Sequence, residues 1–392
     1  MQDSPPPTTQ ASNPPTSDDD RHAGMTAQEL AEAKEYSHKS LICTLLDKGT
    51  DLVYLGLFAF LAAQPLDRWL STFAPFQGRT ARLAALFLIV IGIHELVSLP
   101  LSYYSGFVLE HRFGLSNLTF AAWLKRHIKR YLMAVVFSMV MFVGLYLVIW
   151  TVGSWWWLLA AGLFFLASVV LGQLTPVLIL PLFYKIEAIT DSQLLERMRR
   201  MAEGTGLSIE GIYRMGLSVE TVKANAMLAG LGRTRRVLMG DTLLDNFSQE
   251  EIEVIFAHEI GHHVHRHIPK MVMLGLLYST LGFWLCNLAL AGQIGSENYD
   301  PTQLPVYTLG MMMFLLTVFS SLLEPLQNSI SRHFERQSDR YALESTGFRQ
   351  AYISAFEKLA KMNKDDPDPP PLEVFWFHSH PPINERLAMA RH

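Results

Sequence analysis

The sequence predicts a mainly α-helical integral membrane protein, with about six transmembrane helices and a smaller soluble subdomain of mixed α and β structure. Two observations lead to this prediction. Half of the 392 residues are hydrophobic and only 17% are charged, whereas an ordinary soluble domain carries about 25% charge. The apolar residues also gather in long runs, several of which approach the ~20 residues that a helix needs to cross a bilayer.

Six apolar runs are long enough, or nearly long enough, to span a membrane as helices. A rise of about 1.5 Å per residue has to cover about 30 Å of hydrocarbon. One such run alone is equally compatible with a buried helix of a soluble protein, whereas six together favour membrane spans. The runs are 52–66, 83–101, 131–152, 155–183, 271–294 and 304–323.

The positions of lysine and arginine predict the orientation of these helices, because short cytoplasmic loops carry an excess of both. Five basic residues lie between positions 112 and 130 and three arginines lie between 332 and 340, whereas loops 151–154 and 295–303 carry none. The loop 67–82 fits less well, since it holds three arginines. We predict cytoplasmic termini, in a multi-pass protein of a cell inner membrane or, in a eukaryote, of the endoplasmic reticulum.

The chain is predicted to divide into five segments. Residues 1–28 are rich in Pro, Ser, Thr and Asp, lack an apolar stretch and are interpreted as a disordered tail. Residues 29–183 contain the first four membrane helices, and residues 271–323 contain the fifth and sixth. Residues 184–270 and 324–392 form soluble segments on the same, cytoplasmic side. The net charge of −4 offers no basic surface for nucleic acid.

The soluble segment begins with alternating helical and extended patterns. Asp191 is the predicted N-cap of an amphipathic helix over 191–203. Residues 211–215 and 236–239 are predicted to form short strands around a turn-rich stretch.

The motif that indicates catalytic chemistry lies on the next predicted helix. Ser248 and Glu251 form a capping box, S-x-x-E, and the helix that it opens is predicted to continue towards the fifth apolar run. This helix contains an H-E-x-x-H motif, made of His258, Glu259 and His262. Residues four apart lie about 40° apart around a helix axis, so both imidazoles can face one metal ion. The alternative is a set of exposed polar residues.

Each residue of this motif has a role in the chemistry of a catalytic zinc site. Zinc bound to two imidazoles lowers the pKa of a bound water to about 7, which makes a nucleophile available at neutral pH. Glu259 lies about 100° from His258 around the helix, where it can accept the proton of that water. The spacing therefore predicts a zinc site with Glu259 as the general base.

A catalytic zinc ion also needs a third protein ligand and an open position for water. Glu335 and Asp339 are again four residues apart and follow the last apolar run. Two predicted spans separate His262 from Glu335, and an even number of crossings returns the chain to the same side of the membrane. We therefore predict Glu335 as the third ligand and Asp339 as an acceptor for a ligand imidazole N–H. The alternative is an exposed acidic pair among arginines.

Two groups of polar residues have uses that the sequence leaves open. His94 and Glu95 lie within the second apolar run, where an ionisable side chain costs about 2.5–3.5 kcal/mol on insertion scales. They either line a chamber or pair with partners on neighbouring helices. His263, His265 and His267 are interpreted as polar residues of the helix face rather than as ligands.

Several motifs occur in an order that resembles one protein family. They are LPLSYYSGFVLEHRFG at 99–114, PLFYKIEAI at 181–189, Asn225-Ala226, DTLL at 241–244, HEIGHH at 258–263, FERQSDRYA at 334–342 and SHPPINER at 379–386. In this order the motifs resemble the type I CAAX prenyl proteases, multi-span zinc metalloendopeptidases of the gluzincin group. The resemblance extends over roughly residues 35–392.

The resemblance implies a barrel of about six transmembrane helices around a large water-filled chamber, with a cytoplasmic α+β zinc-peptidase subdomain at one end. It implies Zn²⁺ as the cofactor and a peptide or protein as the substrate. It also implies that Asn225 binds the substrate backbone and that His380 and Arg386 lie by the catalytic centre. His380 is expected to support the substrate or the oxyanion, and Arg386 to contribute to substrate binding.

The sequence departs from the eukaryotic members in ways that favour a prokaryotic-type member. A polar tail stands in place of an extra N-terminal span, a long charged insertion before the zinc helix is absent, and His263 replaces an aromatic residue after the motif. The expected substrates are C-terminal prenylated peptides or a broader set of membrane proteins in quality control. The sequence gives no indication of the oligomeric state.

Two other functions share this motif or this membrane setting. A site-2-type intramembrane protease carries H-E-x-x-H inside an apolar span, whereas here a polar subdomain precedes the motif. A non-catalytic membrane protein with a structural zinc ion usually supplies four ligands, and the sequence offers three good candidates. We therefore predict a zinc-dependent endopeptidase embedded in the lipid bilayer.

Overall fold

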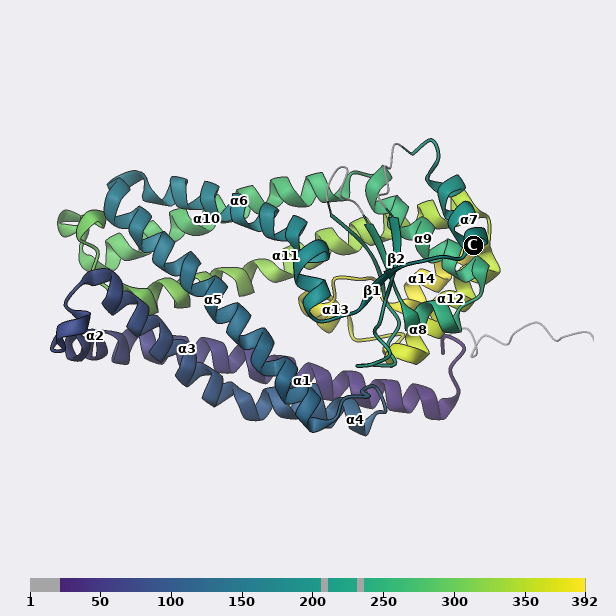
Figure 1. Cartoon of the computed structure of the whole chain (residues 1–392), viewed down its shortest axis with the longest axis horizontal. Coiled ribbons are helices and arrows are strands. Elements are labelled where there is room, and N and C mark those ends of the chain that lie inside the picture. The colour runs from purple at the N-terminus through teal and green to yellow at the C-terminus, as the bar shows by residue number, and fades with distance from the viewer. Residues whose placement is uncertain (1–21, 206–210, 231–235, 392) are drawn as a thin grey trace, which may run out of the picture.

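The computed structural model describes residues 22–205, 211–230 and 236–391. Long helices fill one end of the molecule, and a small sheet with shorter helices fills the other (Figure 1). The long helices and their short connections are α1 (Ala27–Leu57), α2 (Ala63–Ser71), α3 (Arg79–Tyr103), α4 (Glu110–Arg112), α5 (Phe120–Val152), α6 (Trp156–Leu174), α10 (His267–Ile294) and α11 (Thr308–Thr346).

Five continuous helical stretches among the described residues are long and apolar enough to cross a membrane. The third of them, Phe120–Leu182, contains both α5 and α6. These two helices reverse direction at Gly153, whose φ of 69° is readily adopted only by glycine (Figure 1). Each of the six predicted apolar runs therefore falls largely within these five stretches.

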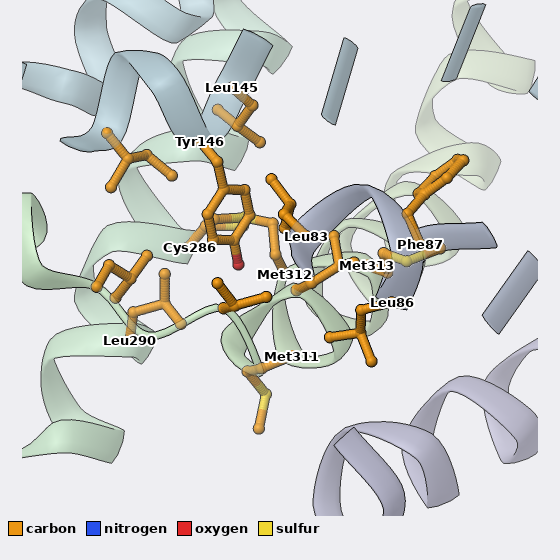
Figure 2. Packing of buried hydrophobic residues seen from close by; sticks show 14 of the residues in the cluster. Leu83, Leu86, Phe87, Leu145, Tyr146, Cys286, Leu290, Met311, Met312 and Met313 are labelled. Atoms are coloured by element: carbon orange, nitrogen blue, oxygen red, sulfur yellow. The ribbon is translucent and has the colours of Figure 1, made fainter. Parts of the chain in front are cut away.

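The long helices pack together around an apolar core (Figure 2). Tyr146 of α5 is fully buried there, and its hydroxyl lies 2.8 Å from Thr308 Oγ1 at the start of α11. The indole N–H of Trp150 donates to the carbonyl of Leu304 at 2.9 Å. These bonds satisfy the polar atoms that the aromatic side chains carry into the core, and they fix α5 against the start of α11.

The two ionisable residues of the second apolar run have partners on neighbouring helices. His94 Nε2 of α3 lies 2.7 Å from Asp51 Oδ1 of α1, and Glu95 Oε1 lies 2.6 Å from His127 Nε2 of α5. Pairing of this kind reduces the cost of placing ionisable groups among apolar helices. Of the two interpretations that the sequence left open, pairing between helices is the one observed.

The sheet has four strands, β1 (Ile186–Ala188), β2 (Gly211–Met215), β3 (Ala226–Ala229) and β4 (Arg236–Gly240). Their order is β1-β2-β4-β3, with β2 and β4 parallel and the outer pairs antiparallel. The predicted strands at 211–215 and 236–239 are confirmed. β1 and β3 were not predicted, and β3 forms an edge of the sheet beside the H-E-x-x-H helix.

The helices around the sheet are α7 (Ser192–Ala202), α8 (Asp241–Asn246), α9 (Gln249–Val264), α12 (Arg349–Asn363), α13 (Pro371–Phe377) and α14 (Ile383–Arg391). Both predicted caps are confirmed. Asp191 accepts hydrogen bonds from two backbone N–H groups of α7. Ser248 and Glu251 bond reciprocally at the start of α9, and Glu251 also accepts from Lys358 of α12 at 2.7 Å.

Three boundaries differ from those predicted. Residues 1–21 of the predicted tail lie outside the described residues, but Ala23 and Met25 are buried and Thr26 caps α1 at Ala27. The predicted continuation of α9 towards the fifth apolar run is wrong, because Arg266 adopts a left-handed conformation between α9 and α10. Finally, α11 continues unbroken through the predicted boundary at 323–324.

Candidate active site

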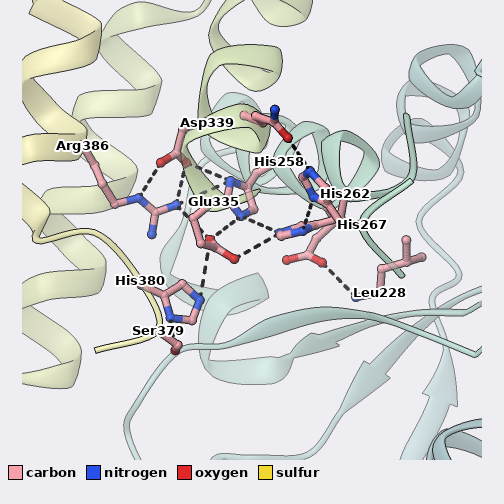
Figure 3. Close-up of polar contacts among 11 residues, drawn as sticks. Leu228, His258, His262, His267, Glu335, Asp339, Ser379, His380 and Arg386 are labelled. Atoms are coloured by element: carbon pink, nitrogen blue, oxygen red, sulfur yellow. Dashed lines mark hydrogen bonds and ion pairs between the residues drawn. The ribbon is translucent and has the colours of Figure 1, made fainter. Parts of the chain in front are cut away.

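The three predicted metal ligands meet where α9 packs against α11 (Figure 3). His258 Nε2 lies 3.1 Å from Glu335 Oε2, and His262 Nε2 lies 3.3 Å from Glu335 Oε1. The two Nε2 atoms are 3.2 Å apart. All three ligand atoms fit within 4.8 Å of one another, a grouping of the kind that holds a metal ion.

A glycine inside the motif permits this close approach of the two helices. A Cβ atom built on Gly261 would lie 2.8 Å from Ser338 Cα and 3.2 Å from the Ser338 carbonyl oxygen. Because both atoms belong to the backbone of α11, no side-chain rotation can relieve the contact. Gly261 therefore sets the spacing between the histidines of α9 and Glu335.

We expect a Gly261→Ala substitution to separate α9 from α11, because overpacking of a filled interface forces the backbone to shift. The expected loss in the free energy of unfolding is about 1–3 kcal/mol, together with weaker metal binding. The measurement is thermal unfolding and metal content of the purified variant. Gly275→Ala is the matched control, since its Cβ would meet nothing within 4 Å. Equal stability of the two variants would contradict this account of the helix spacing.

Asp339 and Arg386 lie behind His258. His258 Nδ1 lies 2.8 Å from Asp339 Oδ1, so its N–H donates to a carboxylate and its Nε2 is directed towards the ligand group. Arg386 donates from Nε to Asp339 Oδ2 at 2.9 Å and from Nη2 to Oδ1 at 2.6 Å. Asp339 is completely buried, so its charge is balanced by protein groups alone.

The charges around His258 favour a cation at this point. Burial alone lowers the pKa of His258, but the carboxylates of Asp339 and Glu335 outweigh this effect and raise the pKa to about 10. The same negative potential that attracts a proton attracts a metal ion.

His262 has a partner that the sequence analysis missed. His267 Nδ1 lies 3.0 Å from His262 Nδ1, and His267 Nε2 lies 2.8 Å from Gln337 Oε1. The sequence analysis interpreted His267 as a polar residue of a continuous helix face. The break at Arg266 is what turns His267 back towards His262. Pro269, in the first turn of α10, is the sequence signal for this break, because a proline inside a helical pattern interrupts the helix.

Glu259 is held beside the ligand group by the edge of the sheet. The backbone N–H of Leu228, in β3, donates to Glu259 Oε2 at 2.9 Å. Burial raises the pKa of Glu259, although positive charge on His258 and His262 opposes this effect. The carboxylate is thus oriented by the backbone and binds a proton more readily than an exposed glutamate.

The remaining predicted residues line a cavity of about 420 Å³ in front of this group. Asn225, His380 and Arg386 share its lining with His258, Glu259 and Glu335. His380 is 62% exposed, and its Nε2 lies 3.6 Å from Glu335 Oε2. The cavity falls in the range of about 300–1,000 Å³ that is typical of ligand pockets. All eight residues predicted for the site therefore lie in or directly behind one cavity.

Each half of the chain matches a model of a known protein family. A model described as peptidase family M48 matches residues 188–392. A model described as the CAAX prenyl protease N-terminal, five membrane helices, matches residues 9–185.

Individual proteins agree with this assignment. The chain is 27% identical over 381 residues to the uncharacterized metalloprotease YhfN of Bacillus subtilis, which covers 93% of this chain and 86% of that protein. It is 30% identical over 315 residues to CAAX prenyl protease 1 of Saccharomyces cerevisiae, covering 76% and 69%. The crystal structure of S. mikatae Ste24p superposes with a TM-score of 0.81 at 25% identity, covering 97% and 91% of the two chains.

The membrane-spanning stretches, the matched families and the shared fold lead to one conclusion, and they confirm the predicted fold class and enzyme class. A metal cofactor and peptide or protein substrates follow from membership of a metallopeptidase family. This chain belongs to peptidase family M48, as an integral-membrane metalloendopeptidase of the CAAX prenyl protease type.

Proposed function

We propose that His258, His262 and Glu335 hold a zinc ion and that this ion makes the site an endopeptidase centre. Two imidazole nitrogens and one carboxylate oxygen are a typical ligand set of catalytic zinc, which keeps a fourth position open. Among the described residues, three potential metal ligands meet at this point, and the group that they form faces the cavity. This convergence of three side chains from two helices is the observation that carries the proposal.

The chain's own residues have distinct parts in the reaction. Bound zinc supplies a Lewis acid that polarises the scissile carbonyl and promotes ionisation of water. Glu259 takes the proton of the attacking water and passes it to the leaving amine. His380 donates a hydrogen bond to the oxyanion that develops on the carbonyl oxygen. Asn225 binds the backbone of the substrate in the cavity.

Asp339 and Arg386 act behind the ligands in this proposal. Asp339 holds the tautomer of His258 through the Nδ1 contact at 2.8 Å. Arg386 neutralises Asp339 with two hydrogen bonds. Arg386 therefore contributes to substrate binding indirectly, by fixing a wall of the cavity that it also lines.

The two alternative functions receive less support. In a site-2-type protease the motif lies within a membrane span, but α9 is not one of the five stretches of the described chain that can cross a membrane. A structural zinc ion takes four protein ligands, and a general base beside it would have no use. The presence of Glu259 beside the ligands, oriented by the Leu228 N–H, therefore favours a catalytic zinc site over a structural one.

We further propose that the site faces the cytoplasm, on the basis of the lysines and arginines at 112–130 and 332–340. The substrates on this side are C-terminal prenylated peptides or a broader set of membrane proteins. A cysteine label near the sheet, tested with a membrane-impermeant reagent in inside-out and right-side-out vesicles, measures this orientation.

Removal of the metal is expected to abolish cleavage. The protein purified in detergent should contain about one zinc ion per chain. It should cleave at least one of two peptides that have the same sequence, one prenylated and the other unprenylated. A chelator should stop cleavage, and added zinc should restore it. Comparable rates for the two peptides indicate the broader substrate class, and a strong preference for the first indicates prenyl recognition. Cleavage that persists without metal would contradict the proposed function.

A further inference from the structure

We propose that His267 is a positioning residue for the ligand His262 and that Gln337 fixes the tautomer through which His267 acts. The inference rests on the proposed function, since it concerns how one ligand of that zinc site is held. His262 and His267 lie side by side next to the ligand group (Figure 3). The contact of His267 with Gln337 extends this chain of contacts away from the ligand group.

Both ring nitrogens of His267 are occupied. Nδ1 lies 3.0 Å from His262 Nδ1, and Nε2 lies 2.8 Å from Gln337 Oε1. The residue is only 2% exposed, so water does not compete for either contact. The ring of Phe334 stacks on the imidazole at a centroid distance of 4.3 Å and an angle of 11°, which fixes the plane of the ring.

These contacts determine where each proton lies. The amide oxygen of Gln337 can only accept, so His267 Nε2 carries the hydrogen of this bond. In a neutral imidazole the other nitrogen is then an acceptor, and His267 Nδ1 accepts from His262 Nδ1–H. His262 Nε2 is left with its lone pair directed towards the ligand group. Gln337 thus selects the tautomer of His262 that can bind a metal ion.

The backbone shows why His267 reaches this position. In a continuous helix, residues five apart lie about 140° apart around the axis, so the two rings would not meet. Arg266, with φ 55° and ψ 40°, ends α9 and starts α10 in a new direction. The centroids of the two imidazoles consequently lie 5.1 Å apart.

One segment of α11 holds both histidine ligands. Within two turns it provides Phe334 and Gln337 for His267, Glu335 as a ligand and Asp339 for His258. Asp339 is neutralised by Arg386, and His267 is uncharged in this tautomer. The two orienting partners therefore add less negative charge beside the metal than two unpaired carboxylates would, and strong negative charge would weaken the metal as a Lewis acid.

The test is the zinc affinity of a His267→Phe variant of the full chain, measured by competition with a chelator. Phenylalanine retains the ring that stacks on Phe334 but leaves His262 Nδ1–H without an acceptor. Loss of an outer partner of a metal ligand typically lowers affinity about 10–100-fold, and we expect a loss in this range. The thermal midpoint of the metal-free protein should stay close to that of the wild type.

Two further variants separate positioning from packing. His267→Asn places an amide oxygen near the position of Nδ1, so we expect it to recover most of the zinc affinity. His265→Phe makes the same substitution at the half-buried imidazole that stacks on His267 at a centroid distance of 5.6 Å. It keeps a ring on that face of His267 and leaves the contact between His267 and His262 in place, so this variant should bind zinc as the wild type does. If His267→Phe does not fold, Gln337→Leu keeps the test open, because it removes the acceptor that selects the tautomer but leaves the ring of His267 in place. The substitution also removes an exposed contact between Gln337 Nε2 and His333 Nε2 at 3.2 Å, which does not involve the ligand group.

The outcomes distinguish this inference from the function on which it rests. Wild-type protein that binds no zinc would contradict the proposed function itself. Wild-type protein that binds zinc tightly, with His267→Phe or Gln337→Leu binding it equally well, would overturn the role of His267 alone. Weakened binding by His267→Phe with recovery by His267→Asn supports positioning.

Discussion

Replacement of Glu259 by glutamine is expected to lower kcat for peptide cleavage by about 10²–10⁴-fold, the usual contribution of a general base, and to leave zinc bound. Glutamine cannot accept the proton of the attacking water. Its amide oxygen can still accept from Leu228 N–H, where the carboxylate now accepts at 2.9 Å. The fold and the ligand group are therefore preserved, and the loss falls on the chemical step.

The measurements are steady-state cleavage and zinc content of the same preparation. Glu250→Gln is the matched control, because Glu250 lies in the first turn of α9, is exposed and stands apart from the cavity. It should cleave at the wild-type rate. Full activity of Glu259→Gln would show that another group removes the proton, and simultaneous loss of zinc would show that Glu259 is needed for metal binding.

Much of this site could be predicted from the sequence, because its central part is local. His258 and His262 share a helix face by spacing alone, and the Ser248–Glu251 capping box marks where that helix begins. Glu335 is 73 residues beyond His262. Its assignment depended on the number of membrane crossings, which fixes the side of the membrane. The family resemblance added Asn225, His380 and Arg386.

The rest depends on conformations and contacts that local patterns alone do not specify. The pairing of His262 with His267 requires a left-handed Arg266, and residues other than glycine adopt that conformation only where the surrounding structure holds them there. β3 is a short edge strand of four residues, whose backbone reaches Glu259. The spacing between α9 and α11 depends on Gly261 meeting Ser338, a contact between segments that are distant in sequence.

The role of Arg386 is the point at which geometry departs most from the resemblance. The resemblance implied that Arg386 binds the substrate. In the structure, however, Arg386 is only 7% exposed and donates two hydrogen bonds to Asp339. Its guanidinium also lies 3.9 Å from the centroid of the Phe356 ring. These contacts indicate that the first role of Arg386 is to stabilise the fold around Asp339, and that contact with the substrate is secondary.

We therefore expect Arg386→Met to destabilise the protein by about 3–5 kcal/mol, because removing one partner of a buried ion pair leaves the other charge uncompensated. Arg336→Met is the matched control. Arg336 pairs with Glu385 at 2.5 Å on the surface, where both side chains are about two-fifths exposed, and such pairs contribute about 0–1 kcal/mol. The measurement is the midpoint of thermal unfolding of each variant.

Combination with Asp339→Asn identifies the cause of the loss. Asparagine removes the uncompensated charge but keeps an oxygen that can accept from His258 Nδ1–H, so the double variant should recover much of the stability that Arg386→Met loses. Such non-additivity is the signature of two groups that interact directly. If Arg386→Met instead unfolds at the wild-type midpoint and raises KM for the peptide at unchanged kcat, Arg386 binds the substrate itself, and the ion pair with Asp339 contributes little to the fold.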